Sequence, residues 1–241
     1  RQDSLFRLLD EATSEELTTI AGILKITDPG KREDLVLAIS AEYRNCARHS
    51  LASWFARDRH SFPYKQILID AADKLKPGFG WTNYKLRDQH TEEEIENDII
   101  QMIGARVDEK LKSMNEAERK KKAEEVLARM DLMAEKNGNV KNIVQNAQLR
   151  AQVSSAVAAG TVGSLFAAPA AAALFYTGLW GGLSAAVFGV GGGALLAGGL
   201  LVALPLALVG GIAIGGGPAY RKSIPVTLAM IGIRKRIGKH E

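Results

Sequence analysis

The sequence predicts an all-α protein, in which a helical domain surrounds or is followed by an Ala/Gly-rich hydrophobic helical hairpin. Apolar residues recur at helical spacing through the first two thirds of the 241 residues. Alternating runs of β-branched residues, the usual sign of a strand, are missing. The 70 residues from Ala151 to Tyr220 contain no Asp, Glu, Lys, Arg or His, which sets them apart from the charged remainder.

Two short helices are predicted at the start of the chain. The first is indicated by an apolar stripe over residues 5–9. Thr13 and Glu16 have the spacing of a capping box, in which a hydroxyl and a carboxylate satisfy free backbone N–H groups at the start of a helix. The turn formers Pro29 and Gly30 are expected to end this second helix.

Four longer helices are predicted after that turn, each from apolar periodicity together with a start or stop signal. Thr91 and Glu94 form a second capping-box pattern, and Asn115 is placed to cap a highly charged segment. The predicted ranges are Glu33–Cys46, Tyr64–Leu75, Thr91 to about Ser113, and Asn115 to about Lys136.

The uncharged segment is long enough to cross a bilayer twice, because one helical crossing needs about 20 apolar residues. Two spans are predicted, Val153–Tyr176 and Ala194–Ile214. Ala and Gly make up 34 of the 70 residues and form small-xxx-small pairs, which let helix backbones approach closely in lipid. The residues predicted to insert include Gly160, Gly163, Pro169, Trp180, Gly189, Gly193, Gly198, Pro205 and Gly211.

Charge is distributed unevenly around this segment. Residues 1–150 carry 25 basic and 26 acidic side chains, whereas the last 21 residues carry six basic and one acidic. Basic residues beside a long apolar run favour an anionic membrane surface, and basic flanks at both ends favour an even number of crossings with both ends cytoplasmic. The predicted surface-binding residues are Arg150, Arg221, Lys222, Arg234, Lys235 and Arg236.

Three parts of the chain are therefore predicted. They are a charged helical domain over residues 1–140, an uncharged hairpin over 141–220, and a basic amphipathic helix within 221–241. The apolar positions of Val226–Ile237 suit this last helix either to an anionic surface or to docking on the helical domain.

Catalytic, cofactor and metal sites are not predicted. Cys46 and His49 share a helix face, but we interpret them as a small buried thiol beside a surface imidazole. The acidic run from Glu92 to Asp98 is what a helix dipole favours in a first turn, and Arg119–Lys122 is interpreted as a solvated helix face. The phosphate-loop, HExxH and EF-hand spacings are missing, and no nucleic-acid motif is found.

Three segments resemble the YaaW-like family of poorly characterised bacterial proteins, which carries an automatic label as a ubiquinol–cytochrome c chaperone family. Gly217–Pro225 is similar to its "GPAYR-x-(T/S)-IP" signature, Tyr64–Lys76 to a "Y-x-x-IL-x-D-x-x-x-KLK" segment, and Ser4–Leu24 to its opening pattern. The matching positions include Tyr64, Asp70, Lys74, Pro218, Tyr220, Arg221 and Pro225. The resemblance implies no catalytic residue.

These patterns lead to a membrane-inserting, non-enzymatic protein as the leading hypothesis, in the manner of a pore-forming or membrane-disrupting bacterial effector or toxin. Its helical domain would shield the hairpin in a soluble form before insertion, and its partners would be an anionic bilayer and other copies or proteins that bind small-residue helix faces. The alternatives are a membrane-associated adaptor or chaperone-like protein without pores, and a soluble helical binding module.

Overall fold

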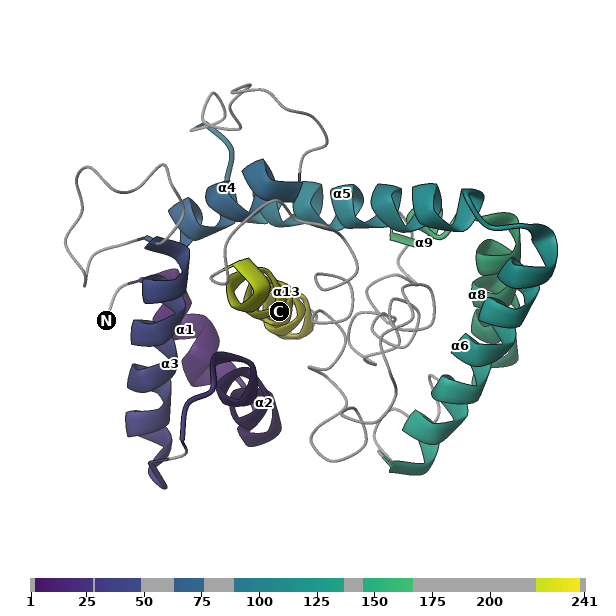
Figure 1. Cartoon of the computed structure of the whole chain (residues 1–241). Helices are drawn as coiled ribbons and strands as arrows, with labels where there is room; N and C mark the ends of the chain where they lie inside the picture. The colour runs from purple at the N-terminus through teal and green to yellow at the C-terminus, as the bar shows by residue number, and fades with distance from the viewer. Residues whose placement is uncertain are drawn as a thin grey trace. The chain divides into compact units, whose positions relative to one another are not determined.

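The computed structural model describes residues 3–27, 29–48, 63–75, 89–136, 145–166 and 220–238. Within these ranges all regular structure is helical, which confirms the all-α prediction (Figure 1). The helices are α1 (Ser4–Glu11), α2 (Ser14–Leu24), α3 (Arg32–Arg48), α4 (Tyr64–Leu75), α5 (Glu92–Lys112), α6 (Glu116–Lys136), α8 (Ala147–Ala159), α9 (Gly163–Phe166) and α13 (Tyr220–Ile237).

Local capping fixes where several helices begin. Thr13 accepts from the backbone N–H of Glu16, and Glu16 accepts in return from the N–H of Thr13, so both halves of the predicted box form. Thr91 and Glu94 repeat this arrangement at the start of α5. Asn115 caps α6 as predicted.

The chain divides into two compact units. The first combines residues 1–99 with residues 212–241, and the second comprises residues 100–211. This division differs from the three consecutive parts predicted from the sequence. The C-terminal helix belongs with the first unit because its apolar side chains pack there, while α6 belongs to the second unit with α8.

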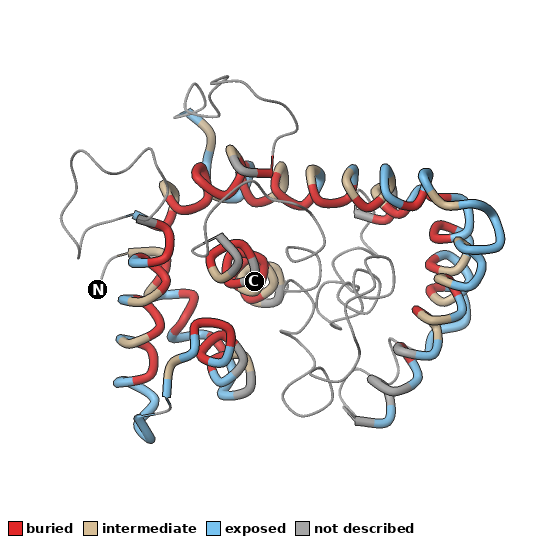
Figure 2. Tube along the Cα trace, in the orientation of Figure 1, coloured by how far each residue is buried: buried red, intermediate tan, exposed pale blue. Residues whose placement is uncertain are grey.

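In the first unit, α13 packs against α1, α2, α3 and α4 (Figure 1). Figure 2 shows the buried positions of α13 and the inward faces of α1 to α4 in red. Of the two roles predicted for the C-terminal basic helix, the structure therefore shows docking on the helical domain. The helix also starts at Tyr220, six residues before the predicted start. Its buried apolar side chains are Ile224, Val226, Leu228, Met230, Ile231 and Ile233.

A buried polar pair fixes the middle of α13. The hydroxyls of Tyr43 on α3 and Thr227 on α13 lie 2.6 Å apart, and both residues are fully buried. Thr227 also donates to the carbonyl of Ser223 one turn earlier. Each buried hydroxyl thus has a hydrogen-bond partner, which a buried polar group needs in order not to destabilise the fold.

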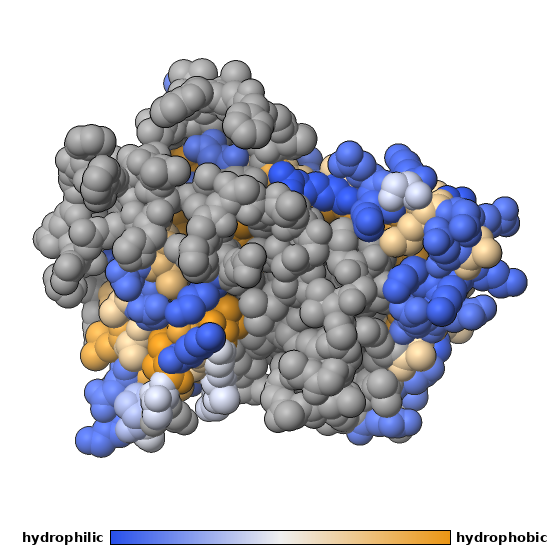
Figure 3. Space-filling view, in the orientation of Figure 1, coloured by the Kyte–Doolittle hydropathy of each residue, from blue (hydrophilic) through white to orange (hydrophobic). Residues whose placement is uncertain are grey.

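In the second unit, α6 packs against α8. Arg119 bridges them by donating to the carbonyl of Ala158 at 2.8 Å and to that of Met114 at 2.7 Å. Lys120 and Lys121 are exposed, as a solvated helix face requires. Figure 3 shows the charged surface of α6 in blue.

The first predicted span is not one continuous helix. α8 ends at Ala159, and Gly160 follows in the left-handed conformation with φ 69°. The N–H of Thr161 reaches back to the carbonyl of Ala156, which closes a glycine-terminated helix end. The prediction of a helix through Val153–Tyr176 was wrong, because the backbone freedom of Gly160 ends α8 there.

Among the described residues, no helix combines the length and the apolar character needed to cross a membrane. Most of the predicted inserting positions lie outside the described residues, and so does one position of the family motif. These positions are Pro169, Trp180, Gly189, Gly193, Gly198, Pro205, Gly211 and Pro218.

Gly163 occupies a tight contact between α9 and α5. Its N–H donates to Asp108 at 2.7 Å, and a Cβ added at Gly163 would lie 2.6 Å from the other carboxylate oxygen of Asp108. Asp108 cannot move aside without losing that hydrogen bond. The structure thus gives this glycine a packing role inside the second unit.

Replacing Gly163 with Ala is therefore expected to lower the free energy of unfolding by about 1–3 kcal/mol, the usual cost of forcing an extra carbon into a packed site. Gly22→Ala in α2 is the opposite control, since a Cβ there meets nothing within 4 Å and a helical glycine costs up to about 1 kcal/mol relative to alanine. Urea denaturation followed by circular dichroism measures both. Equal effects for the two variants would contradict the assigned contact.

Candidate functional site

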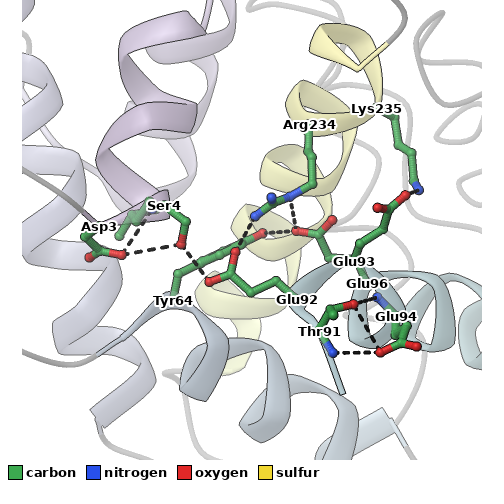
Figure 4. Close-up of polar contacts among 11 residues, drawn as sticks. Asp3, Ser4, Tyr64, Thr91, Glu92, Glu93, Glu94, Glu96, Arg234 and Lys235 are labelled. Carbon is green, nitrogen blue, oxygen red and sulfur yellow. Dashed lines mark hydrogen bonds and ion pairs between the residues drawn. The ribbon is translucent and has the colours of Figure 1, made fainter. Parts of the chain in front are cut away.

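The densest polar cluster in the first unit joins the start of α5 to the last turn of α13 (Figure 4). Arg234 on α13 lies between two carboxylates of α5. Its Nη2 donates to Glu92 at 2.6 Å, and its Nε donates to Glu96 at 2.9 Å. We call Glu92, Glu96, Arg234 and Tyr64 the α5–α13 junction.

The helix start of α5 positions the two carboxylates. The capping box at Thr91 fixes the first turn, and residues four apart on a helix project from the same face. Glu92 and Glu96 therefore present their side chains to the same neighbour. Lys235 follows Arg234 and pairs with Glu93 at 3.3 Å on the exposed edge of the cluster.

Two further helices complete the junction. The phenol of Tyr64, the first residue of α4, donates to Glu96 Oε1 at 2.9 Å. Ser4 of α1 donates to Glu92 at 2.7 Å. The guanidinium of Arg234 also lies over the Tyr64 ring, 5.7 Å from its centroid, a cation–π arrangement. The junction therefore links α1, α4, α5 and α13.

Glu96 is the unusual member of the junction. Its side chain has no exposed surface, and among the described residues nothing donates a hydrogen bond to its Oε2. Burial raises the pKa of Glu96 to about 7, against the opposing effects of Arg234 and Tyr64. A carboxyl group with this pKa changes its charge near neutral pH.

The chemistry of this cluster suits it to holding a helix. Glu96 is closed off from solvent, so a substrate cannot reach it without displacing α13. A search of the described ranges finds no group of three metal-ligating side chains. What the junction can do is take up or release a proton and alter how strongly α13 is held.

Several residues predicted to contact a membrane surface form ion pairs within the protein instead. Arg234 and Lys235 pair with α5, as described above. Lys222 donates to the carbonyl of Leu24 and to Glu42, and Arg150 pairs with Asp131. The side chains of Arg221 and Arg236 lie outside the described residues.

The family-motif positions divide in the same way. Tyr64 lies in the junction, and Asp70 is buried and accepts from Gln66 at 3.0 Å. Tyr220 is the first residue of α13, and Pro225 lies within that helix. The side chains of Lys74 and Pro225 are outside the described residues.

Cys46 is buried, as interpreted from the sequence. Burial, followed by the nearby carboxylate of Glu42, raises the pKa of its thiol to about 12. A thiol with so high a pKa carries almost no thiolate at neutral pH and is a poor nucleophile. His49 lies outside the described residues.

The sequence analysis missed Glu96, because it interpreted the whole acidic run as a helix start. A signal was present in the periodicity of α5. The buried residues Ile99, Ile100 and Ile103 lie three, four and seven positions after Glu96, so this carboxyl falls within the apolar stripe of the helix. A charged residue inside such a stripe requires a buried partner, and Arg234 supplies it.

Comparison of the chain with protein-family models, curated proteins and solved structures gave no match. The resemblance to the YaaW-like family therefore stays a prediction. Function is inferred below from the residues and contacts of this chain alone.

Proposed function

We propose that the protein is a non-enzymatic, membrane-inserting protein that disrupts or permeabilises an anionic bilayer. The observation that carries this proposal is the uncharged segment from Ala151 to Tyr220. Placing Asp, Lys or Arg at the centre of a membrane helix costs about 2.5–3.5 kcal/mol. Seventy residues without such a side chain remove this obstacle over the length of at least two crossings.

The composition of the segment supports close helix packing within lipid. A water-soluble helix loses about 1 kcal/mol for each glycine that replaces alanine, so its 16 glycines are a poor choice for a bundle that stays in water. In lipid, glycine and alanine allow backbones to approach and gain van der Waals contacts. The same residues allow copies of the chain to associate.

The folded units support a division of labour between the uncharged segment and its flanks. Lys222, Arg234 and Lys235 are paired with carboxylates of the first unit, so their charges are largely neutralised there. We therefore assign the main lipid contact to the uncharged segment and an anchoring role to α13. The attraction to anionic lipid then contributes less than the +5 charge of the tail indicates.

Dye release from vesicles containing phosphatidylglycerol tests the proposal. The wild-type chain is expected to release dye, and Gly193→Glu is expected to reduce the rate by on the order of 100-fold, since a charge at the bilayer centre costs about 3 kcal/mol. Gly193→Ala is the matched control and should retain most of the activity.

The outcomes separate the candidate functions. Vesicle binding without dye release would identify a membrane-associated adaptor and reject pore formation. An absence of both binding and release would reject the membrane proposal as a whole. Equal activity of the Glu and Ala variants would show that this part of the segment does not enter the bilayer.

A further inference from the structure

The charges of the α5–α13 junction do not balance. Two carboxylates, Glu92 and Glu96, face one guanidinium, that of Arg234. With both carboxylates ionised, the buried cluster carries one excess negative charge. With Glu96 protonated, Arg234 and Glu92 neutralise each other.

We propose that this junction is a pH-sensitive latch on α13, which holds the helix most tightly when Glu96 is protonated and loosens as Glu96 ionises. The role of the latch in membrane insertion depends on the proposed function, because α13 directly follows the uncharged segment in the chain. The latch itself is a property of the first unit and does not depend on lipid.

The geometry favours the protonated state at Glu96. Oε1 already accepts from Tyr64 and Arg234 and can do so from a neutral carboxyl group as well. Among the described residues, Oε2 has no donor, so an ionised Glu96 would leave part of its charge buried without compensation. Burying such an uncompensated charge costs more than burying a neutral O–H group.

The other groups that face Glu96 do not share this behaviour. Tyr64 on α4 and Tyr43 on α3 have pKa values raised by burial, so both phenols stay neutral near pH 7. The pKa of Arg234 on α13 is raised by Glu96 and other anionic neighbours despite its burial, so it stays charged. Glu92, on the same helix as Glu96, is held by Ser4 and Arg234.

The direction of the effect follows from linkage. The pKa of Glu96 is about 7 in the folded unit and 4.5 when the group is solvated, so the docked state binds more protons between these values. Its contribution to docking is complete below pH 4.5 and is lost as the pH rises through 7. Raising the pH therefore loosens α13, and acidification tightens it.

Hydrogen exchange of the full-length chain, resolved to the α13 peptides, tests the latch. Protection of α13, corrected for the intrinsic pH dependence of exchange, is expected to fall on the order of 30-fold between pH 5.5 and pH 8. Peptides of α8 in the second unit serve as the internal reference. Unchanged protection of α13 in the wild type would overturn the proposal without any variant.

Two substitutions on one helix sharpen the test. Glu96→Gln imitates the neutral acid and should remove the pH dependence while keeping α13 protected at pH 8. Glu93→Gln removes the neighbouring carboxylate, which is 66% exposed and pairs with Lys235, and should behave like the wild type. Identical pH profiles for the two variants would contradict the role of Glu96.

Dye release separates this inference from the proposed function. If both are correct, release by the wild type increases with pH and release by Glu96→Gln does not. Release that occurs without pH-dependent protection of α13 would reject the latch alone. A pH-dependent latch in a protein that neither binds nor permeabilises vesicles would reject the membrane function alone.

Discussion

Replacing Arg234 with Ala is expected to lower the free energy of unfolding of the first unit by about 3–5 kcal/mol at pH 8. This is the usual cost of removing one partner of a buried ion pair, because the remaining charge stays buried without compensation. Here two carboxylates, Glu92 and Glu96, lose their common donor. The contact of the guanidinium with the Tyr64 ring is lost as well. Urea denaturation of the full-length chain measures the change.

The same substitution should cost less at pH 5, because Glu96 is then protonated and needs no counter-charge. Lys235→Ala is the matched control on the next residue. Its ion pair with Glu93 is largely exposed, and such pairs contribute at most about 1 kcal/mol. A loss for Arg234→Ala that is the same at both pH values, or no larger than that for Lys235→Ala, would contradict the junction as described.

Ile231→Ala is expected to cost about 2–5 kcal/mol, because it leaves a cavity where α13 meets the other helices of the first unit. Ile231 has no exposed surface, so its full side chain contributes to the core. Ile231→Val removes one methyl group and should cost only about 0.5–1.5 kcal/mol. Thermal unfolding followed by circular dichroism gives both values. A smaller loss for Ala than for Val would show that α13 is not part of the cooperative core.

Local signals predicted most of the described helices. The capping boxes at Thr13 and Thr91 form as expected, and α4 runs from Tyr64 to Leu75 as its apolar spacing indicates. Such signals depend on residues three or four positions apart, so they can be recognised in a single sequence. They predict where a helix begins and ends, and they carry no information about which distant helix it contacts.

The destination of α13 required long-range information. Its apolar face suited either a membrane surface or a protein core, and the two environments favour the same side chains. The structure decides between them through the partners of its polar residues. Thr227 meets Tyr43, and Arg234 meets Glu96, at separations of 184 and 138 residues along the chain.

Glycine was ambiguous for a related reason. Gly160 and Gly163 fit a small-residue packing motif in lipid, yet one ends α8 with a positive φ and the other makes room for Asp108. A missing Cβ serves each of these purposes equally well. The sequence shows that these positions are small, and only the surroundings show why.

The insertion of residues 100–211 within the first unit has a consequence for how the protein is made. Ribosomes add about 5–20 residues per second, so the inserted residues delay the appearance of α13 by on the order of ten seconds. During that interval residues 1–99 have been synthesised, but the helix that fills their core has not. A nascent chain at this stage exposes apolar surface and carboxylates without their arginine, and it is therefore the form of the protein most in need of a chaperone.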